Sequence, residues 1–206
     1  MKKIIAKLQP IGRALMLPIA VLPVAALLLR LGQPDLLNMP AIAAAGDAIF
    51  SNLGLLFALG VAVGLARENH GAAGLAGVVG YLVATQGAKV LIDVPPEITA
   101  NIPEQFKALV SEAFRAKELS KLSVPVGLLS GLIAGWAYNR FSEIRLPSYL
   151  AFFGGRRFVP IVSGFAGLGL AICTTWIVLG IRETRRWVKP TRKEPKRSAS
   201  GEHDGH

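Results

Sequence analysis

The chain has 206 residues, of which 52% are hydrophobic and 17% are charged, and its formal net charge is +10. Because a soluble domain usually carries about 25% charged residues, this composition argues against a water-soluble globular protein. The cations cluster at the ends of apolar segments without an aromatic-interleaved basic face, so we expect membrane lipid as a partner and no nucleic acid.

Five windows of the sequence contain no Asp, Glu, Lys or Arg. They are 14–29, 48–66, 69–88, 122–139 and 158–181. Their 16 to 24 residues correspond to about 24–36 Å of α-helix, and the hydrocarbon core of a bilayer is ~30 Å thick. A single soluble core could not surround five such helices. The sequence therefore predicts an all-α polytopic membrane protein with about five transmembrane helices.

This pattern divides the chain into three parts. We expect a cytoplasmic amphipathic segment at 1–13, a transmembrane region at 14–181 and a basic, disordered tail at 182–206. The single cysteine, Cys173, excludes an intramolecular disulfide, and its apolar surroundings predict a small buried hydrophobe.

The first window contains Pro18 and Pro23, which neighbouring helices can accommodate within a span. A secretory signal peptide is the competing interpretation, with a cleavage pattern at Ala41-Ile42-Ala43. That pattern lies far beyond the apolar core, and four more windows follow, which favours a retained span.

Polar residues at the window boundaries give no catalytic or metal-binding pattern. Asp47 precedes the second window and is expected to cap its helix. His70 lies at the start of the third window, where a solvated interfacial histidine is favoured over a proton relay. His203 and His206 belong to the polar tail. We therefore predict no catalytic residue, no metal site and no cofactor.

Glycines recur at helical spacing within the windows. Gly127, Gly131 and Gly135 lie four residues apart on one helix face. Small residues mark helix–helix interfaces in membranes, because they allow backbones to approach closely. We expect this stripe to pack within the bundle, and a face that contacts a second subunit is the alternative.

Loop charges predict the orientation, since Lys and Arg accumulate on the cytoplasmic side. The first 13 residues carry four cations. The link between the last two windows carries Arg140, Arg145, Arg156 and Arg157 against Glu143 alone. With the N-terminus inside, the four crossings before this link make it cytoplasmic, and a fifth crossing follows it. The basic tail would then lie outside, which conflicts with the same rule.

Three stretches of sequence carry a family resemblance. IGRALMLPIAVLPVAALLLRLGQPDLL, AIFSNLGLLFALGVAVGLARENHGAAGLAGVVGYLV and AGWAYNRFSEIRLPSYLAFFGGRRFVPI resemble the membrane-embedded IIC component of sugar phosphotransferase systems, in the glucose/N-acetylglucosamine branch. The resemblance runs from about Leu8 to about Ala171, and RLGQPDLLN at Arg30–Asn38 is most similar to the N-acetylglucosamine subgroup.

The resemblance implies a homodimeric sugar permease of the bacterial inner membrane that works with IIB and IIA components. Such permeases bind sugar through a later Thr-Glu-Pro motif, whereas the Glu-Pro pair here is Glu194-Pro195, preceded by Lys193. The phospho-acceptor cysteine of IIB also has no counterpart. We therefore expect a truncated permease that takes part in uptake and phosphorylation of N-acetylglucosamine or glucose. The alternative is a non-transporting fragment that only dimerises or pairs with a separately encoded second half.

Arg156 and Arg157 are the candidate site residues. Their first interpretation is an orientation anchor at the cytoplasmic face. Their second is a docking site for the phosphorylated IIB partner, because two cations can hold its charge through hydrogen bonds.

Overall fold

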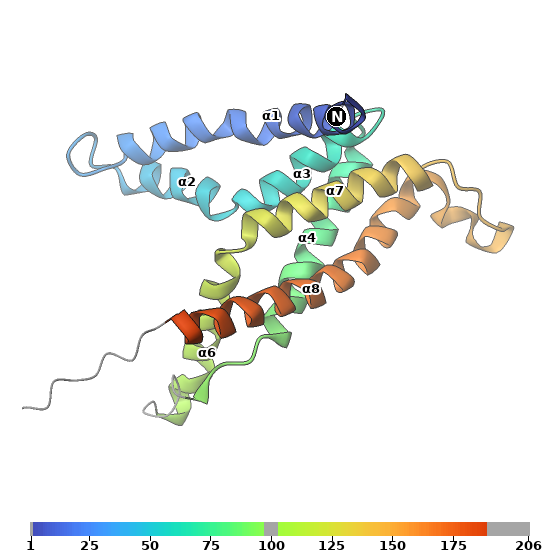
Figure 1. The fold of residues 1–206 in the computed structure, drawn as a ribbon. Helices are drawn as coiled ribbons and strands as arrows, with labels where there is room; N and C mark the ends of the chain where they lie inside the picture. The colour runs from blue at the N-terminus through green and yellow to red at the C-terminus, as the bar shows by residue number, and fades with distance from the viewer. Residues whose placement is uncertain (1, 97–102, 189–206) are drawn as a thin grey trace, which may run out of the picture.

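The computed structural model describes residues 2–96 and 103–188, and this part of the chain is helical and contains no strand (Figure 1). The α-helices are α1 (Lys2–Leu31), α2 (Pro40–Ser51), α3 (Leu53–Leu65), α4 (Gly71–Leu91), α6 (Glu104–Ser120), α7 (Ser123–Phe141) and α8 (Phe158–Val188). Two short 3-10 helices, η1 (Ser148–Phe153) and η2 (Gly155–Arg157), lie between α7 and α8. The predicted all-α class is confirmed.

The helices account for the five apolar windows. Three segments are long and apolar enough to cross a membrane alone, namely Gln9–Leu31, Gly71–Leu91 and Gly155–Ile181. Two bent helix pairs, α2 with α3 and α6 with α7, are each long and apolar enough to form one further crossing. The described residues therefore contain three to five candidate spans.

Successive crossings run in opposite directions. A Cβ atom built on Gly64 of α3 would touch Ala14 of α1, and one built on Gly60 would touch Pro18, so α1 and α3 are antiparallel. The same comparison makes α3 antiparallel to α4 and parallel to α7, and α4 parallel to α8. The ends of α3 and α7 therefore share one end of the bundle with the starts of α4 and α8. We call this the linker end, because the links 66–70 and 142–157 lie there.

The chain bends by 57° where α2 meets α3, inside the predicted window. The Asn52 amide donates a hydrogen bond to the backbone oxygen of Ala48 at 2.8 Å, and Asn52 itself leaves the helical conformation. Such side chains compete with the helix for backbone groups. Because α2 begins at Pro40, Asp47 lies inside the helix, and the prediction that it caps a helix is wrong.

α6 is amphipathic, and the window analysis did not predict it. Phe106 and Leu109 are exposed, and charged residues occupy much of the remaining surface. The Nε atom of Arg115 donates to the backbone oxygen of Ile92 at 3.0 Å, which ties α6 to the end of α4. Its charges hid this helix from a search for uncharged segments.

The expected segment boundaries differ from the helix ends. α1 runs from Lys2 through residue 13 without a break, and α8 continues past residue 181 to Val188. The rest of the tail, 189–206, lies outside the described residues. Cys173 is exposed on α8, so the prediction that it is buried is wrong.

The core is built from small side chains that let helices approach closely. One cluster consists of Ala62, Ala66, Ala73, Ala76, Ala134, Ala137, Tyr138 and Val159. At another contact, the Ser130 hydroxyl of α7 donates to the backbone oxygen of Gly77 in α4 at 2.9 Å. Tight backbone approach therefore replaces the large aliphatic residues of a soluble core.

Candidate functional site

The two arginines of the doublet contact different groups at the linker end. The Nη2 atom of Arg156 lies 2.5 Å from Oε2 of Glu68, in the link between α3 and α4. The guanidinium carbon of Arg157 lies 4.9 Å from the centre of the Phe152 ring, a cation–π contact. Gly155 precedes them with φ +69°, a left-handed conformation that glycine adopts without strain. Arg156 thus forms an ion pair, whereas Arg157 lies over an aromatic ring.

Glu68 also accepts a hydrogen bond from a buried tyrosine. The Tyr138 hydroxyl donates to Oε2 of Glu68 at 3.3 Å, and the Tyr138 side chain is almost wholly buried. The ring of His70 stacks on that of Tyr138, with centres 6.0 Å apart. The Nδ1 atom of His70 accepts from the backbone N–H of Ala72 at 3.0 Å, so His70 caps α4. This role as a cap was not part of the sequence prediction.

Asn139 connects the end of α7 to the end of α3. Its Oδ1 atom accepts from the backbone N–H of Arg67 at 2.9 Å, and its Nδ2 atom donates to the backbone oxygen of Leu65 at 2.9 Å. These bonds satisfy backbone groups that the helix end leaves free. We refer to Glu68, His70, Tyr138, Asn139 and Arg156 as the linker-end cluster.

Three members of this cluster were not predicted from the sequence, namely Glu68, Tyr138 and Asn139. A signal was present, because Arg67-Glu68-Asn69-His70 and Tyr138-Asn139-Arg140 are polar runs next to apolar windows. The sequence alone did not show that these two runs contact each other, because their bonded residues are 70 to 72 positions apart.

The predicted glycine stripe lies against α3. A Cβ atom built on Gly127 would stand 2.0 Å from the backbone oxygen of Gly54, and one on Gly131 would stand 2.8 Å from that of Ala58. A Cβ atom on Gly135 would reach Leu65 at 2.7 Å. In this structure all three positions therefore face a neighbouring helix of the same chain.

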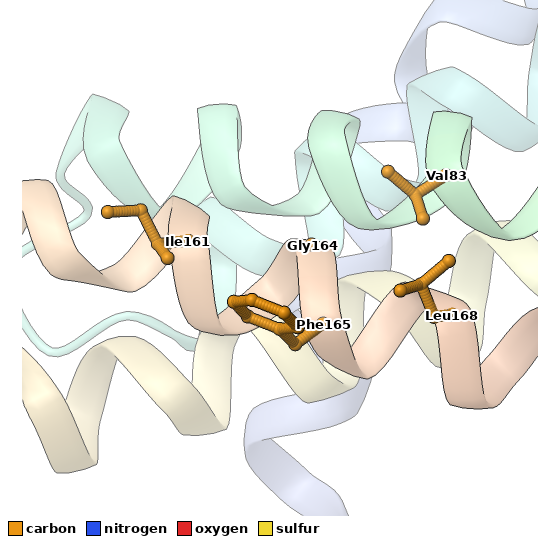
Figure 2. A pocket seen from close by; sticks show the side chains of 5 residues that line it. All are labelled: Val83, Ile161, Gly164, Phe165 and Leu168. Carbon is orange, nitrogen blue, oxygen red and sulfur yellow. The ribbon is translucent and has the colours of Figure 1, made fainter.

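Two of the surface pockets formed by described residues differ in their lining, and the larger of the two is apolar. The larger, about 320 Å³, is lined by Val83 of α4 and by Ile161, Gly164, Phe165 and Leu168 of α8 (Figure 2). The smaller, about 220 Å³, is lined by Gln9, Pro10, Arg13 and Gly64. A specific sugar site needs several convergent hydrogen-bonding groups, which the larger pocket lacks, while the smaller pocket presents the side chains of Gln9 and Arg13 alone.

The linker-end cluster joins the two links through polar contacts. Within the described residues, no group of three His, Cys, Asp or Glu side chains could hold a metal ion. The carboxylate of Glu68 is occupied by a cation and a hydroxyl donor, and both contacts hold linkers in place. Fold and site together define a polytopic helical membrane protein whose two linkers at one end are joined by polar contacts.

This membrane protein matches a known protein family. Residues 12–184 match the family described as phosphotransferase system, EIIC, and the chain belongs to that family. The resemblance seen in the sequence is confirmed, and the match continues past Ala171, where the resemblance was expected to stop.

The chain is also similar to curated proteins named for amino sugars and for glucose. It is 52% identical over 163 residues to the N-acetylglucosamine-specific EIICBA component of Escherichia coli (strain K12), covering 79% of this chain and 21% of that protein. It is 43% identical to the glucosamine-specific EIICBA component of Bacillus subtilis (strain 168), covering 85% and 26%. It is 41% identical to the glucose-specific EIICBA component of Staphylococcus carnosus (strain TM300), covering 82% and 27%. The chain thus spans about a quarter of the length of these relatives.

Proposed function

We propose that this chain is a sugar permease subunit of a phosphotransferase system and takes part in the uptake and coupled phosphorylation of N-acetylglucosamine. The observation that carries the proposal is the 52% identity to an N-acetylglucosamine-specific relative, against 43% and 41% to relatives named for glucosamine and glucose. The stretch Arg30–Asn38 supports the same choice. Glucose is the second candidate sugar.

The proposed setting is the bacterial inner membrane, with the N-terminus and the linker end in the cytoplasm. Three arginines against Glu143 in the link 142–157, with Arg140 in the last turn of α7, support this orientation through the positive-inside rule. IIB and IIA components are the proposed partners, because the relatives are named EIICBA components. A homodimer is the expected assembly.

The sugar-binding groups are proposed to come from a part of the permease other than the described residues. The larger pocket is apolar, the smaller pocket presents Gln9 and Arg13 alone, and the acidic sugar-binding motif of the family is absent from this sequence. Docking of phosphorylated IIB on Arg156 and Arg157 stays a prediction. We expect Arg156 to contribute less to this docking than Arg157, because the ion pair with Glu68 already compensates part of the Arg156 charge.

A chimera tests the proposed function. Residues 1–171 of this chain would replace the matching segment of the E. coli relative, in cells that lack their own uptake system for the sugar. We expect phosphoenolpyruvate-dependent uptake of N-acetylglucosamine, while the relative with that segment deleted serves as the negative control. A chimera that inserts into the membrane and accumulates normally without transporting the sugar would contradict the proposal.

The alternative is a fragment that does not transport by itself and pairs with a second half. Three cultures separate the two cases: the chain alone, the remaining segment of the relative alone, and both expressed as separate polypeptides. Uptake in the first culture shows autonomous transport. Uptake in the third culture alone supports pairing of two halves.

A further inference from the structure

The link between α7 and α8 carries an unusual group of exposed apolar side chains. Tyr149 is 81% exposed and Phe152 is 72% exposed, and Leu150 and Phe153 are also exposed. All four belong to η1, which extends beyond the helix bundle (Figure 1). Exposed aromatic residues gathered in one short segment mark a surface that meets something other than water.

Cations flank this group in the sequence, and Arg157 contacts its Phe152 ring. Arg140, Arg145 and Arg157 are exposed, and within the described residues none of them forms an ion pair with a carboxylate. Glu143 is the one acidic residue of the link 142–157. The surface around η1 is therefore both aromatic and positively charged.

The position of the link explains this combination. A candidate membrane span begins at Gly155, directly after η1. The Trp136 and Phe141 rings meet edge to face with centres 6.0 Å apart, and Phe141 meets Phe158 in the same way at 6.2 Å. Aromatic side chains gather at the boundary between hydrocarbon and water, and arginines extend their charge from there toward the headgroups.

We propose that residues 148–157 form an interfacial anchor that binds anionic phospholipid, with Arg157 holding the headgroup phosphate. The exposed rings of Tyr149 and Phe152 enter the boundary between headgroups and acyl chains. Phe152 supports the Arg157 guanidinium from one side, which leaves its N–H groups free to donate two hydrogen bonds to one phosphate. Arg156 takes no part, since Glu68 holds it.

Lipid fits this surface better than a soluble protein partner does. The positive charge of the arginines is complementary to the anionic headgroups of the membrane leaflet that they face. The aromatic residues of η1 adjoin the first residues of a candidate membrane span. A soluble partner would have to cover rings that adjoin the first residues of a candidate span. The proposal requires only that the helices cross a membrane, so it does not depend on the identity of the sugar.

Lipid binding by charge variants provides the first test. The purified full chain would be titrated with phosphatidylglycerol and with phosphatidylcholine in detergent, and bound lipid would be counted by native mass spectrometry. Arg157→Gln is expected to weaken phosphatidylglycerol binding about fivefold, the effect of one cation at an anionic surface. Arg157→Lys should retain most of the binding. Lys117→Gln, which removes one exposed cation from α6, is the matched control and should bind like the unaltered chain.

Membrane depth provides the second test. A fluorescent label on Phe152→Cys, in a Cys173→Ser background, should be quenched by lipids with a spin label near the headgroup and protected from aqueous iodide. If Arg157→Gln does not give monodisperse protein, phosphatidylglycerol binding by Phe152→Ala tests the proposal instead. This variant removes an exposed side chain and should also weaken the binding.

Three results would overturn the proposal. The first is equal phosphatidylglycerol binding by the unaltered chain and Arg157→Gln. The second is full quenching of the label by iodide. The third is a loss of IIB-dependent phosphorylation in the chimera carrying Arg157→Gln while phosphatidylglycerol binding is unchanged, which would assign the residue to a protein partner.

Discussion

The Nη2 atom of Arg156 lies 2.5 Å from the Oε2 atom of Glu68, although 88 positions separate the two residues in the sequence. Glu68 follows α3 and Arg156 lies just before α8, so the ion pair joins two links at the same end of the bundle. Tyr138 and Asn139 add contacts from α7 to the same link. This end of the protein is therefore held by polar bonds, and the middle of the bundle by glycine and alanine contacts.

Breaking the ion pair should destabilise the linker end modestly. The two side chains are 50% and 54% exposed, and exposed pairs contribute about 0.2–1 kcal/mol. A double-mutant cycle of Glu68→Gln and Arg156→Gln, followed by thermal unfolding in detergent, should give a coupling energy in that range. The charge-swapped double variant Glu68→Arg with Arg156→Glu should recover part of the stability that the single variants lose. A coupling energy of zero would show that the contact does not stabilise the protein.

Gly127 should tolerate no side chain. Its Cβ position lies 2.0 Å from the backbone oxygen of Gly54, so Gly127→Ala must separate α7 from α3, at a cost of about 1–3 kcal/mol. Gly169→Ala in α8 is the matched control, because nothing lies within 4 Å of its Cβ position. Each variant would be heated in detergent, and the height of its monodisperse peak on size-exclusion chromatography would be followed against temperature to give an unfolding temperature. Equal stability of both would refute the close contact between α3 and α7.

The cap on α4 should depend on an acceptor at position 70. Removing a side chain that caps a helix costs typically about 1 kcal/mol. His70→Ala should therefore lower the unfolding temperature, and it also removes the ring stacked on Tyr138. His70→Asn keeps an acceptor and should recover the share that comes from the cap. If both variants lose the same stability, the stacking contact matters and the cap does not.

The turn after α1 should make stability sensitive to acid. Arg30 donates a hydrogen bond to Asp35 at 2.9 Å, which lowers the pKa of that carboxyl below its ordinary value of 3.8. A lowered carboxyl pKa gives stability that is present above 3.8 and is lost as the pH falls through the native pKa.

Asp35→Asn should therefore unfold with a weaker pH dependence on the acid side, measured from about pH 6 to about pH 3. Arg30→Gln should remove the same dependence, because it removes the donor. The effect should be small, since both side chains are more than half exposed. A steeper acid dependence in Asp35→Asn would contradict the assignment.

Hydropathy alone predicted the crossings well. Each of the five uncharged windows coincides with a helix or a bent pair, because hydrocarbon requires long apolar segments that bond their own backbone. The same reasoning missed α6, whose charges conceal an amphipathic helix, and the bend at Asn52, which arises from one side-chain bond to a backbone oxygen.

The site could be predicted only in part. The Arg156–Arg157 pair stood out as adjacent cations before an apolar run, but their different contacts depend on Gly155, Glu68 and Phe152. Nothing in the local sequence singled out Glu68, since one acidic residue in a short polar link is common. Pairing across 88 positions is a property of the folded bundle and not of either local sequence.

Cysteine accessibility in intact cells tests the central claim, that the chain crosses the membrane in alternating directions with both links of the linker end on the cytoplasmic side. Arg67→Cys, Ser148→Cys and Leu36→Cys would each be made in a Cys173→Ser background and treated with a membrane-impermeant thiol reagent from outside. The account predicts labelling at position 36 alone, with positions 67 and 148 modified only after the membrane is opened. Labelling of positions 67 and 148 from opposite sides, or of positions 36 and 148 from the same side, would contradict it.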